Sequence, residues 1–126
     1  IDTALTTLTF EDGTYAVIDN SRKAVYGYDQ RIEIFGSGGM IQVENNLHHR
    51  NILFDEKGIH HSLPLDFFMD RYANSYRMEI SLFIRSITED LPVPVGADDA
   101  LKSTRIAYAA KKSAAEGRPV TLKEIE

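Results

Sequence analysis

The sequence predicts an α+β domain in which an open, mostly antiparallel sheet carries helices packed on one of its faces. In the first half of the chain, apolar and polar residues alternate with a period of two, which is typical of strands with two different faces. In the second half, apolar residues recur at intervals of three and four, which is typical of amphipathic helices. Strands that come first and helices that follow favour the α+β class.

The expected strands are joined by short turns in which glycine accepts the positive φ that tight turns need. Glu11-Asp12-Gly13-Thr14, Gly36-Ser37-Gly38-Gly39 and Asp55-Glu56-Lys57-Gly58 are the turns. The predicted strands are residues 4–10, 15–20, 29–35, 40–44, 51–54 and 59–63.

Two helices are expected in the second half. The first carries an apolar stripe from Met69 to Ile87, and the segment Leu91-Pro92-Val93-Pro94 ends it because proline lacks the N–H donor. The second starts at Asp98 and Asp99, whose acidic side chains suit the positive end of a helix. Gly117 and the proline that follows it predict where the second helix stops.

Two amphipathic helices can cover only one face of the sheet, so the other face is expected to meet solvent or another protein. The candidate residues on that face mix hydroxyl, aromatic and charged side chains: Thr7, Thr9, Tyr15, Val17, Arg31, Glu33 and Phe35. This mixture suits an oligomer interface. We therefore expect the domain to self-associate through its sheet.

Composition narrows the classes of function. The 126 residues suit one domain, and a formal charge of −5 argues against general binding to nucleic-acid backbones. Cysteine is absent, which excludes disulfides and thiolate metal sites and is compatible with a cytoplasmic protein. No apolar run approaches the roughly 20 residues that span a bilayer. Because Ile1 already lies in a strand pattern, we expect residues 1–126 to be one domain of a longer protein.

Three patterns that often carry chemistry are interpreted here as structural. The glycines of residues 36–39 are followed by a strand, whereas a dinucleotide loop must open a helix. The pairs His48-His49 and His60-His61 point to opposite faces of a strand, and a turn at 55–58 puts His60 near Leu53. No carboxylate pair and no Ser/His/Asp arrangement is legible. We therefore assign no catalytic, cofactor-binding or metal-binding residue.

Tyr26-Gly27-Tyr28-Asp29 places ring hydroxyls and a carboxylate at the edge of a strand, where a polyhydroxylated ligand would find hydrogen-bonding groups. Tyr72 and Tyr76 lie on the apolar stripe of the first helix. Packing is the favoured role for Tyr72. Tyr76 lies near Arg71 on the helix surface and is placed to present its hydroxyl at the margin of the stripe.

Several segments resemble the C-terminal domain of the glucose-fructose oxidoreductase/inositol dehydrogenase/rhizopine catabolism family. They are Asp2-Thr3-Ala4, Leu8-Thr9-Phe10, Asp19-Asn20-Ser21-Arg22, Tyr26-Gly27-Tyr28-Asp29-Gln30-Arg31, Phe35-Gly36-Ser37 with Gly39-Met40, and Glu116-Gly117-Arg118-Pro119-Val120. The resemblance spans nearly the whole chain. The Tyr-Gly-Tyr-Asp segment is typical of the inositol branch, whereas Glu-Gly-Arg-Pro is shared widely across the family.

The resemblance implies that this chain is the domain that shapes the substrate pocket and builds dimers or tetramers through its exposed sheet face. The cofactor, NAD, and the catalytic lysine, aspartate and histidine would belong to an N-terminal Rossmann domain that precedes this chain. The fragment alone would be inactive. The whole protein would be an oxidoreductase that oxidises a polyol, with myo-inositol to 2-keto-myo-inositol as the favoured reaction.

The resemblance also implies which residues contact the polyol. Tyr28 matches the second tyrosine of Tyr-Gly-Tyr-Asp, and Tyr76 matches the tyrosine of an Arg-aromatic-x-x-x-Tyr pattern on the helix. Asp29 and Arg71 are weaker candidates that would act from behind these tyrosines. Two alternatives stay open: a non-catalytic sugar-binding or oligomerisation module of the same fold, and a dehydrogenase for another sugar or inositol isomer. The choice between NAD and NADP also stays open.

Overall fold

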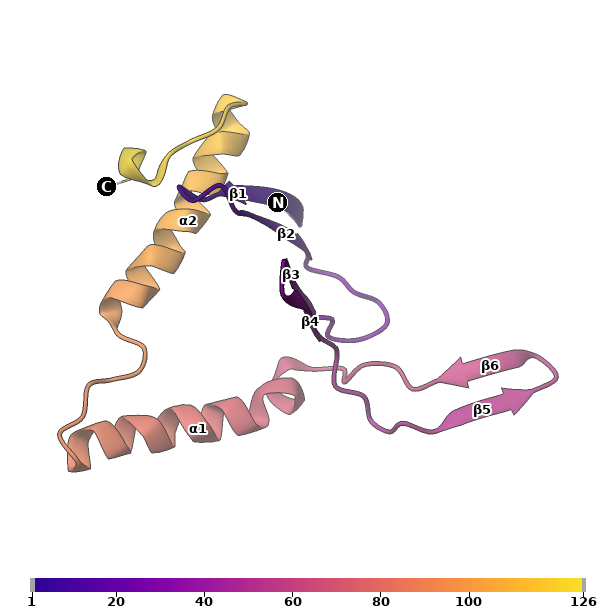
Figure 1. The fold of residues 1–126 in the computed structure, drawn as a ribbon. Coiled ribbons are helices and arrows are strands. Elements are labelled where there is room, and N and C mark those ends of the chain that lie inside the picture. Colours follow the sequence, from indigo (N-terminus) through magenta and orange to yellow (C-terminus); the bar gives the residue numbers. More distant parts are fainter. Residues whose placement is uncertain (1, 126) are drawn as a thin grey trace. The chain divides into compact units, whose positions relative to one another are not determined.

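The computed structural model describes residues 2–125 and confirms the α+β class (Figure 1). Six strands come first and two long helices follow. The elements are β1 (Thr3–Thr9), β2 (Tyr15–Ser21), β3 (Ile32–Gly36), β4 (Gly39–Val43), β5 (Ile52–Asp55), β6 (Gly58–His61), α1 (Phe68–Thr88), α2 (Ala97–Glu116) and the short 3₁₀ helix η1 (Leu122–Glu124).

The strands pair as three two-stranded hairpins, β1–β2, β3–β4 and β5–β6, where the sequence predicts one open sheet. In the β3–β4 hairpin, Gly36 lies opposite Gly39, which confirms that the glycines form a plain turn. In the β5–β6 hairpin, His60 lies opposite Leu53, as predicted. Alternation identifies which residues form strands and where each turn falls. It carries no information on which hairpins lie side by side.

The predicted third strand begins three residues later than expected, at Ile32 instead of Asp29. A side chain takes one backbone hydrogen bond of this segment, and a second bond joins two of its side chains. The Gln30 N–H donates to Asn45 Oδ1 at 2.8 Å, and the Asp29 carboxylate accepts from Arg31 at 2.8 Å. The segment before β3 is therefore a loop held by its own side chains.

Both helices end close to where the sequence predicts. α1 stops at Thr88, ahead of the proline segment, because Asp90 adopts a left-handed φ of 53° and the Leu91 N–H returns to the Ser86 carbonyl at 3.0 Å. At the start of α2, Asp99 Oδ2 accepts from the Gly96 N–H at 3.1 Å. At its end, Gly117 has φ 65° and donates to the Ser113 carbonyl at 2.9 Å.

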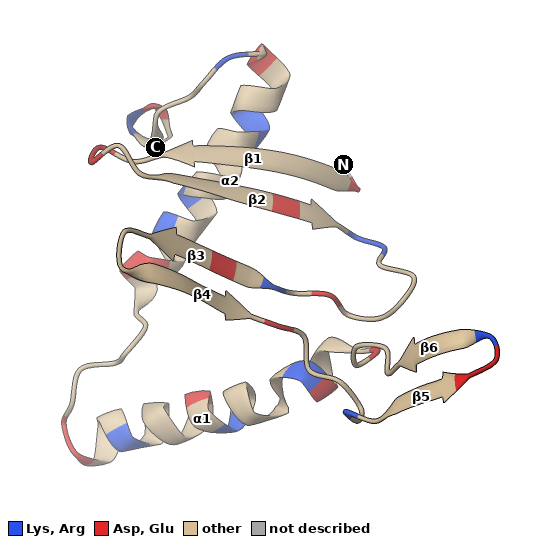
Figure 2. Cartoon of the chain, turned by 45° about the vertical axis from the view of Figure 1, so that its right-hand side comes forward, with Lys and Arg blue, Asp and Glu red and all other residues tan. Residues whose placement is uncertain are grey.

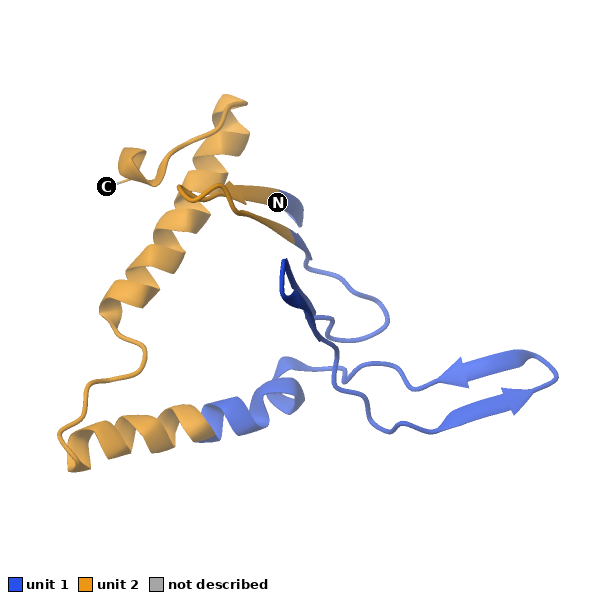
Figure 3. Ribbon diagram, viewed as in Figure 1, with its two compact units in different colours: residues 1–5, 19–77 blue, residues 6–18, 78–126 orange. Residues whose placement is uncertain are grey.

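The chain divides into two compact units (Figure 3). Residues 1–5 and 19–77 form one, and residues 6–18 and 78–126 form the other, so that the division passes through β1, β2 and α1. The first unit contains the loop between β2 and β3, two hairpins and the start of α1. The second contains α2 and η1. The predicted packing of both helices on one sheet face involves both units and stays a prediction, as does an oligomer interface on the opposite face.

Charged side chains are scattered along the helices, turns and loops (Figure 2). Both helices carry basic as well as acidic residues. Among residues 2–125, no helix is both long and apolar enough to cross a lipid bilayer.

Candidate functional site

The loop between β2 and β3 is held against the segment that leads into α1. The Tyr28 N–H donates to the Leu65 carbonyl at 2.8 Å. Gly27 precedes it with a φ of +133°, and a Cβ at this position would lie 3.0 Å from the Pro64 carbonyl oxygen. Only glycine accepts both this backbone conformation and this close approach. The glycine of Tyr-Gly-Tyr-Asp therefore lets the Tyr28 backbone reach Leu65.

Tyr28 joins three rings of α1 to form what we call the aromatic row: Phe68, Tyr28, Tyr72 and Tyr76. The centroid of the Tyr28 ring lies 6.5 Å from that of Phe68 and 5.9 Å from that of Tyr72, in an edge-on arrangement with Tyr72. Tyr72 in turn meets Tyr76 edge-on at 6.4 Å. The α1 residues are four apart, which puts them on one side of the helix.

The aromatic row offers three phenol hydroxyls. Tyr28 and Tyr72 are half-buried, whereas Tyr76 is 40% exposed. Burial raises the pKa of Tyr72, and the adjacent Tyr28 side chain raises it further. The Tyr72 hydroxyl thus keeps its proton at neutral pH. A neutral phenol both donates and accepts a hydrogen bond, as a sugar or polyol hydroxyl does.

Arg71 packs against the aromatic row with part of its hydrogen-bonding capacity unused. The carbon at the centre of its guanidinium group lies 5.9 Å from the centroid of the Tyr72 ring, and Nη2 donates to the Gln30 carbonyl at 3.1 Å. Its Nε–H is buried and has no acceptor within residues 2–125. An unpaired buried donor costs about 1–3 kcal/mol. Among residues 2–125, the Arg71 Nε–H is therefore a buried donor that makes no hydrogen bond.

Asp29 holds the loop together. Its carboxylate accepts hydrogen bonds from Tyr26 Oη at 2.6 Å, Arg31 Nε and Nη2 at 2.8 and 2.9 Å, and Asn45 Nδ2 at 2.6 Å. The Arg31 guanidinium, followed by Tyr26 and Asn45, holds the pKa of Asp29 well below its usual range. With 13% of the side chain exposed and four donors engaged, Asp29 has little capacity left for a ligand.

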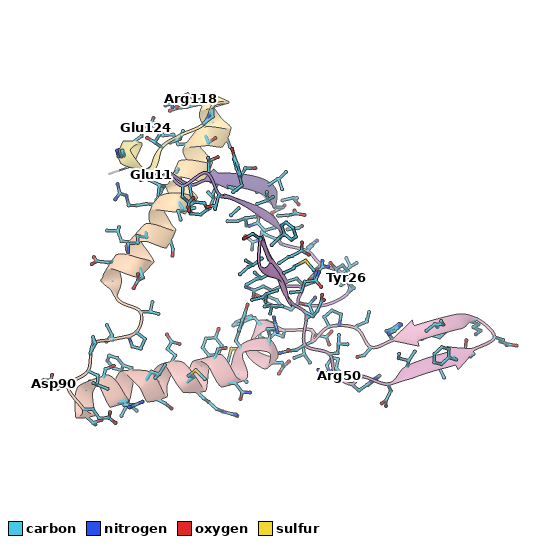
Figure 4. All side chains as sticks on the ribbon, in the orientation of Figure 1. Glu11, Tyr26, Arg50, Asp90, Arg118 and Glu124 are labelled. Carbon is cyan, nitrogen blue, oxygen red and sulfur yellow. The ribbon has the colours of Figure 1, made fainter. Side chains whose placement is uncertain are left out.

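A shallow hollow of about 490 Å³ lies beside this loop. It is lined by Tyr26, Asp29, Arg31, Glu44, Asn45, Leu47 and Pro64. Figure 4 labels Tyr26 on the loop between β2 and β3. Of the residues that the sequence predicts to contact a ligand, only Asp29 lines the hollow, and Tyr28, Arg71 and Tyr76 do not. The hollow and the aromatic row are therefore separate features of the first unit.

The structure brings the four sequence-predicted residues together in two groups. Tyr28 and Tyr76 share contact with Tyr72, against which Arg71 also packs, whereas Asp29 faces Asn45. Tyr72, assigned to packing from the sequence, joins the two tyrosines, and its spacing of four from Tyr76 was the signal for it. Asn45 was not predicted, because 16 residues separate it from Asp29. Within residues 2–125, no cluster of His, Cys, Asp or Glu is arranged to hold a metal ion.

Comparison with known proteins identifies the class. Residues 1–122 match the family described as "Oxidoreductase family, C-terminal alpha/beta domain". Because the match covers nearly the whole chain, the chain belongs to this family.

Three similar proteins narrow the class further. Myo-inositol 2-dehydrogenase of Thermotoga maritima is 46% identical over 125 residues, which cover 99% of this chain and 37% of that protein. The crystal structure of a probable dehydrogenase from Thermotoga maritima has a TM-score of 0.95 at 45% identity, covering 100% of this chain and 38% of the other. The scyllo-inositol dehydrogenase of Lactobacillus casei, solved with bound NAD(H) and scyllo-inositol, has a TM-score of 0.89 at 26% identity, covering 98% and 36%. The chain thus spans a little over a third of the length of each.

Proposed function

We propose that this chain is the substrate-contacting domain of an NAD-dependent dehydrogenase that oxidises myo-inositol to 2-keto-myo-inositol. One geometric observation carries the proposal: Tyr28, Tyr72 and Tyr76 line up three phenol rings beside an unpaired Arg71 donor. A ring of alcohols is recognised by groups that both donate and accept, and aromatic rings cover its C–H faces. The similarity to a myo-inositol 2-dehydrogenase narrows the polyol to inositol.

In this proposal the residues of the chain orient the polyol. Tyr28 and Tyr76 bind its hydroxyls from two elements, the β2–β3 loop and α1. Tyr72 holds the two rings at a fixed spacing, and Arg71 lies against Tyr72 with its free Nε–H available to an oxygen acceptor. Holding the substrate in one orientation lowers the barrier of a reaction that takes place on a neighbouring group.

The residues of this chain do not fit an NAD site. A dinucleotide site needs a glycine-rich turn that opens a helix, so that backbone N–H groups face the pyrophosphate. Here the glycine-rich turn joins β3 to β4. NAD supplies a hydride acceptor when it is bound. We therefore place NAD, and the groups that move the proton, in an N-terminal Rossmann domain of a longer protein, in line with the 37% coverage of the Thermotoga relative.

We further propose that the whole protein is a cytoplasmic dimer or tetramer that assembles through exposed apolar side chains of its strands, among them Val17 on β2 and Phe35 on β3. These two side chains are 64% and 83% exposed. Analytical ultracentrifugation of the full-length protein tests this, with Val17→Lys and Phe35→Lys as disrupting variants. Assembly of the double variant equal to that of the wild type would contradict the proposed interface.

A specific observation supports a second substrate. The Lactobacillus relative was solved with scyllo-inositol, a stereoisomer in which the axial hydroxyl of myo-inositol is equatorial. The aromatic row presents hydroxyls that donate and accept, and this chemistry fits either isomer. Scyllo-inositol is therefore the alternative substrate.

The decisive experiment measures NAD reduction by the full-length protein with myo-inositol, scyllo-inositol and glucose in parallel. We expect the highest kcat/KM with myo-inositol and no turnover by residues 1–126 alone. A higher value with scyllo-inositol would support the alternative substrate. A full-length protein that oxidises none of the polyols with NAD or NADP would contradict the proposal and favour a non-catalytic binding module.

A further inference from the structure

Asn45 and Asp29 form a pair in which nearly every hydrogen-bonding group is used. Asn45 follows β4, and its amide bridges two consecutive residues of the β2–β3 loop. Nδ2 donates to Asp29 Oδ1 at 2.6 Å, and Oδ1 accepts from the Gln30 N–H at 2.8 Å. A backbone N–H can only donate, so the orientation of the amide group is determined. The pair thus fixes the loop immediately after Tyr28.

The backbone on the other side of Tyr28 is also fixed. The Tyr28 N–H bonds to the Leu65 carbonyl, and the Leu65 N–H bonds to the Asn46 carbonyl at 3.1 Å. Asn45 and its neighbour Asn46 therefore hold both the loop and the segment against which the loop packs. Tyr28 has its backbone constrained before and after the Cα atom, and its ring lies between those of Phe68 and Tyr72.

The same connections reach the rest of the aromatic row. The Gln30 carbonyl, next to the N–H that Asn45 holds, accepts from Arg71 Nη2 at 3.1 Å. The Arg71 guanidinium lies over the Tyr72 ring, which meets the Tyr28 ring edge-on. A continuous series of contacts therefore runs from Asn45 through Gln30, Arg71 and Tyr72 to Tyr28. It closes through Asp29, which follows Tyr28 in the chain and bonds to Asn45. Displacing the loop would alter several of these contacts together.

We propose that Asp29 and Asn45 are positioning residues, which set the orientation of Tyr28 toward the polyol without touching the polyol themselves. The inference rests on the proposed function for the role of Tyr28, but the geometry that carries it is independent of the substrate. Asp29 uses its oxygens on Tyr26, Arg31 and Asn45, and Asn45 uses both ends of its amide. Neither side chain appears among the ring contacts of the aromatic row.

The kinetic test uses the full-length enzyme with Asp29→Asn and Asn45→Ala, each alone and combined with Tyr28→Phe. For either single variant we expect kcat/KM for the polyol to fall about tenfold, with KM for NAD within about twofold of the wild type. In the Tyr28→Phe background the same substitutions should cost less than about threefold, because groups that act through one side chain are not additive. A purely structural role would give the same fold-change in both backgrounds.

Glu89→Gln is the matched control. It removes a carboxylate charge from an arginine partner, Arg85 at 2.9 Å, but Glu89 lies in the turn just after α1 and has 49% of its side chain accessible. We expect polyol kinetics within about twofold of the wild type for this variant. A loss equal to that of Asp29→Asn would mean that any lost ion pair lowers activity, and it would overturn the inference.

Hydrogen exchange gives a second readout that needs no turnover. In the full-length protein, the Tyr28 N–H should exchange about tenfold faster in Asn45→Ala than in the wild type, whereas amides in α2 should not change. Asn45→Ala keeps the Asp29–Arg31 pair, so it decides the question if Asp29→Asn does not fold. Unchanged exchange at Tyr28 would overturn the inference.

The two proposals fail differently. If Tyr28→Phe leaves polyol kinetics unchanged, the proposed binding role of Tyr28 is wrong, and so is the part of the inference that concerns the polyol. If Tyr28→Phe lowers kcat/KM but the Asp29 and Asn45 substitutions are additive with it, the binding role stands and positioning by the pair is wrong.

Discussion

Asp29 and Glu124 are two carboxylates with the same kind of partners in different settings. Asp29 accepts from Arg31 and from side chains of the β2–β3 loop and of the segment after β4. Glu124 accepts from Arg118 Nη2 at 2.7 Å and from the Thr121 N–H at 3.0 Å (Figure 4). The pKa of each carboxyl is lowered, in both cases mainly by an arginine. Their hydrogen-bond donors and the direction of their pKa shifts therefore do not distinguish the two carboxylates.

The two carboxylates differ in the part of the structure that each one stabilises. The Asp29 side chain is 13% exposed and adjoins Tyr28, whereas that of Glu124 is 31% exposed and closes the turn at the end of the chain. In that turn, Arg105 on α2 donates to the Leu122 and Ile125 carbonyls at 3.0 and 2.6 Å. The first network lies beside the tyrosine that we propose contacts the polyol, and the second joins the backbone of the C-terminal turn to α2. We therefore expect substitutions in the first to change polyol kinetics and those in the second to change stability.

The largest difference should come from removing single hydroxyls. Tyr28→Phe and Tyr76→Phe keep the rings and should lower kcat/KM for the polyol about ten- to a hundredfold, with KM for NAD nearly unchanged. An unpaired buried partner costs roughly 1–3 kcal/mol, and each 1.36 kcal/mol corresponds to a tenfold change. Steady-state kinetics with polyol and NAD varied separately measure both constants.

Tyr108→Phe is the matched control for this experiment. Tyr108 lies on α2 in the second unit and is 58% exposed. We expect removal of the Tyr108 hydroxyl to leave kcat/KM for the polyol and KM for NAD within about twofold of the wild type. An equal loss of activity in Tyr108→Phe would break the proposed division of roles between the two regions.

Arg105→Gln should produce the opposite pattern. Its guanidinium makes three hydrogen bonds to the Leu122 and Ile125 carbonyls, and the shorter glutamine cannot reproduce them. We expect a loss of about 1.5–3 kcal/mol in the free energy of unfolding, the usual range for hydrogen bonds to a charged group. Urea unfolding measures the loss, and polyol kinetics should stay within about twofold. A tenfold fall in kcat/KM with unchanged stability would contradict the assignment.

Arg71→Lys should have an intermediate kinetic effect. Lysine keeps the charge, but it loses the planar group that lies over Tyr72 and the Nη2 donor to Gln30. A cation over an aromatic ring contributes about 0.5–1 kcal/mol at an exposed site. We expect KM for the polyol to rise about fivefold while the Tm falls little. A KM equal to that of the wild type would remove Arg71 from the site.

Local patterns predicted most of the fold. The turn at Gly36–Gly39, the pairing of His60 with Leu53 and the end of α2 at Gly117 all follow from the conformational freedom of glycine and the period of a strand. The start of β3 was not predictable, because the hydrogen bond that ends the loop comes from Asn45, beyond the next strand. How the three hairpins are arranged depends on contacts that residue alternation does not specify.

The contacts among the rings of the aromatic row were predictable only in part. Tyr72 and Tyr76 are four residues apart on a helix, and that spacing alone puts them in contact. That Tyr28 meets Tyr72 depends on the loop after β2 packing on the segment before α1, which no local pattern encodes. The assignment of Tyr28 and Tyr76 to a polyol came from the family resemblance, and it stays a prediction until the kinetics are measured.

The smallest effect should come from Glu124 and should depend on pH. The Arg118 hydrogen bond, followed by the Thr121 N–H, lowers the pKa of Glu124 from its ordinary value of 4.5 to about 2. A lowered pKa means that the folded state favours the ionised carboxylate. Its contribution to stability is thus complete above pH 4.5 and is lost as the pH falls toward 2.

Glu124→Gln removes that contribution at every pH, so the variant and the wild type should differ most near neutrality. For such an accessible ion pair we expect a Tm about 2 °C lower for Glu124→Gln at pH 7, with the difference shrinking between pH 4.5 and pH 3. Calorimetry of both full-length proteins over this range measures it. Asp29→Asn should show the same sign, because the pKa of Asp29 is also lowered, but it should reduce polyol kinetics as well. A Tm difference for Glu124→Gln that is equal at pH 3 and pH 7 would mean that the charge of Glu124 does not stabilise the C-terminal turn.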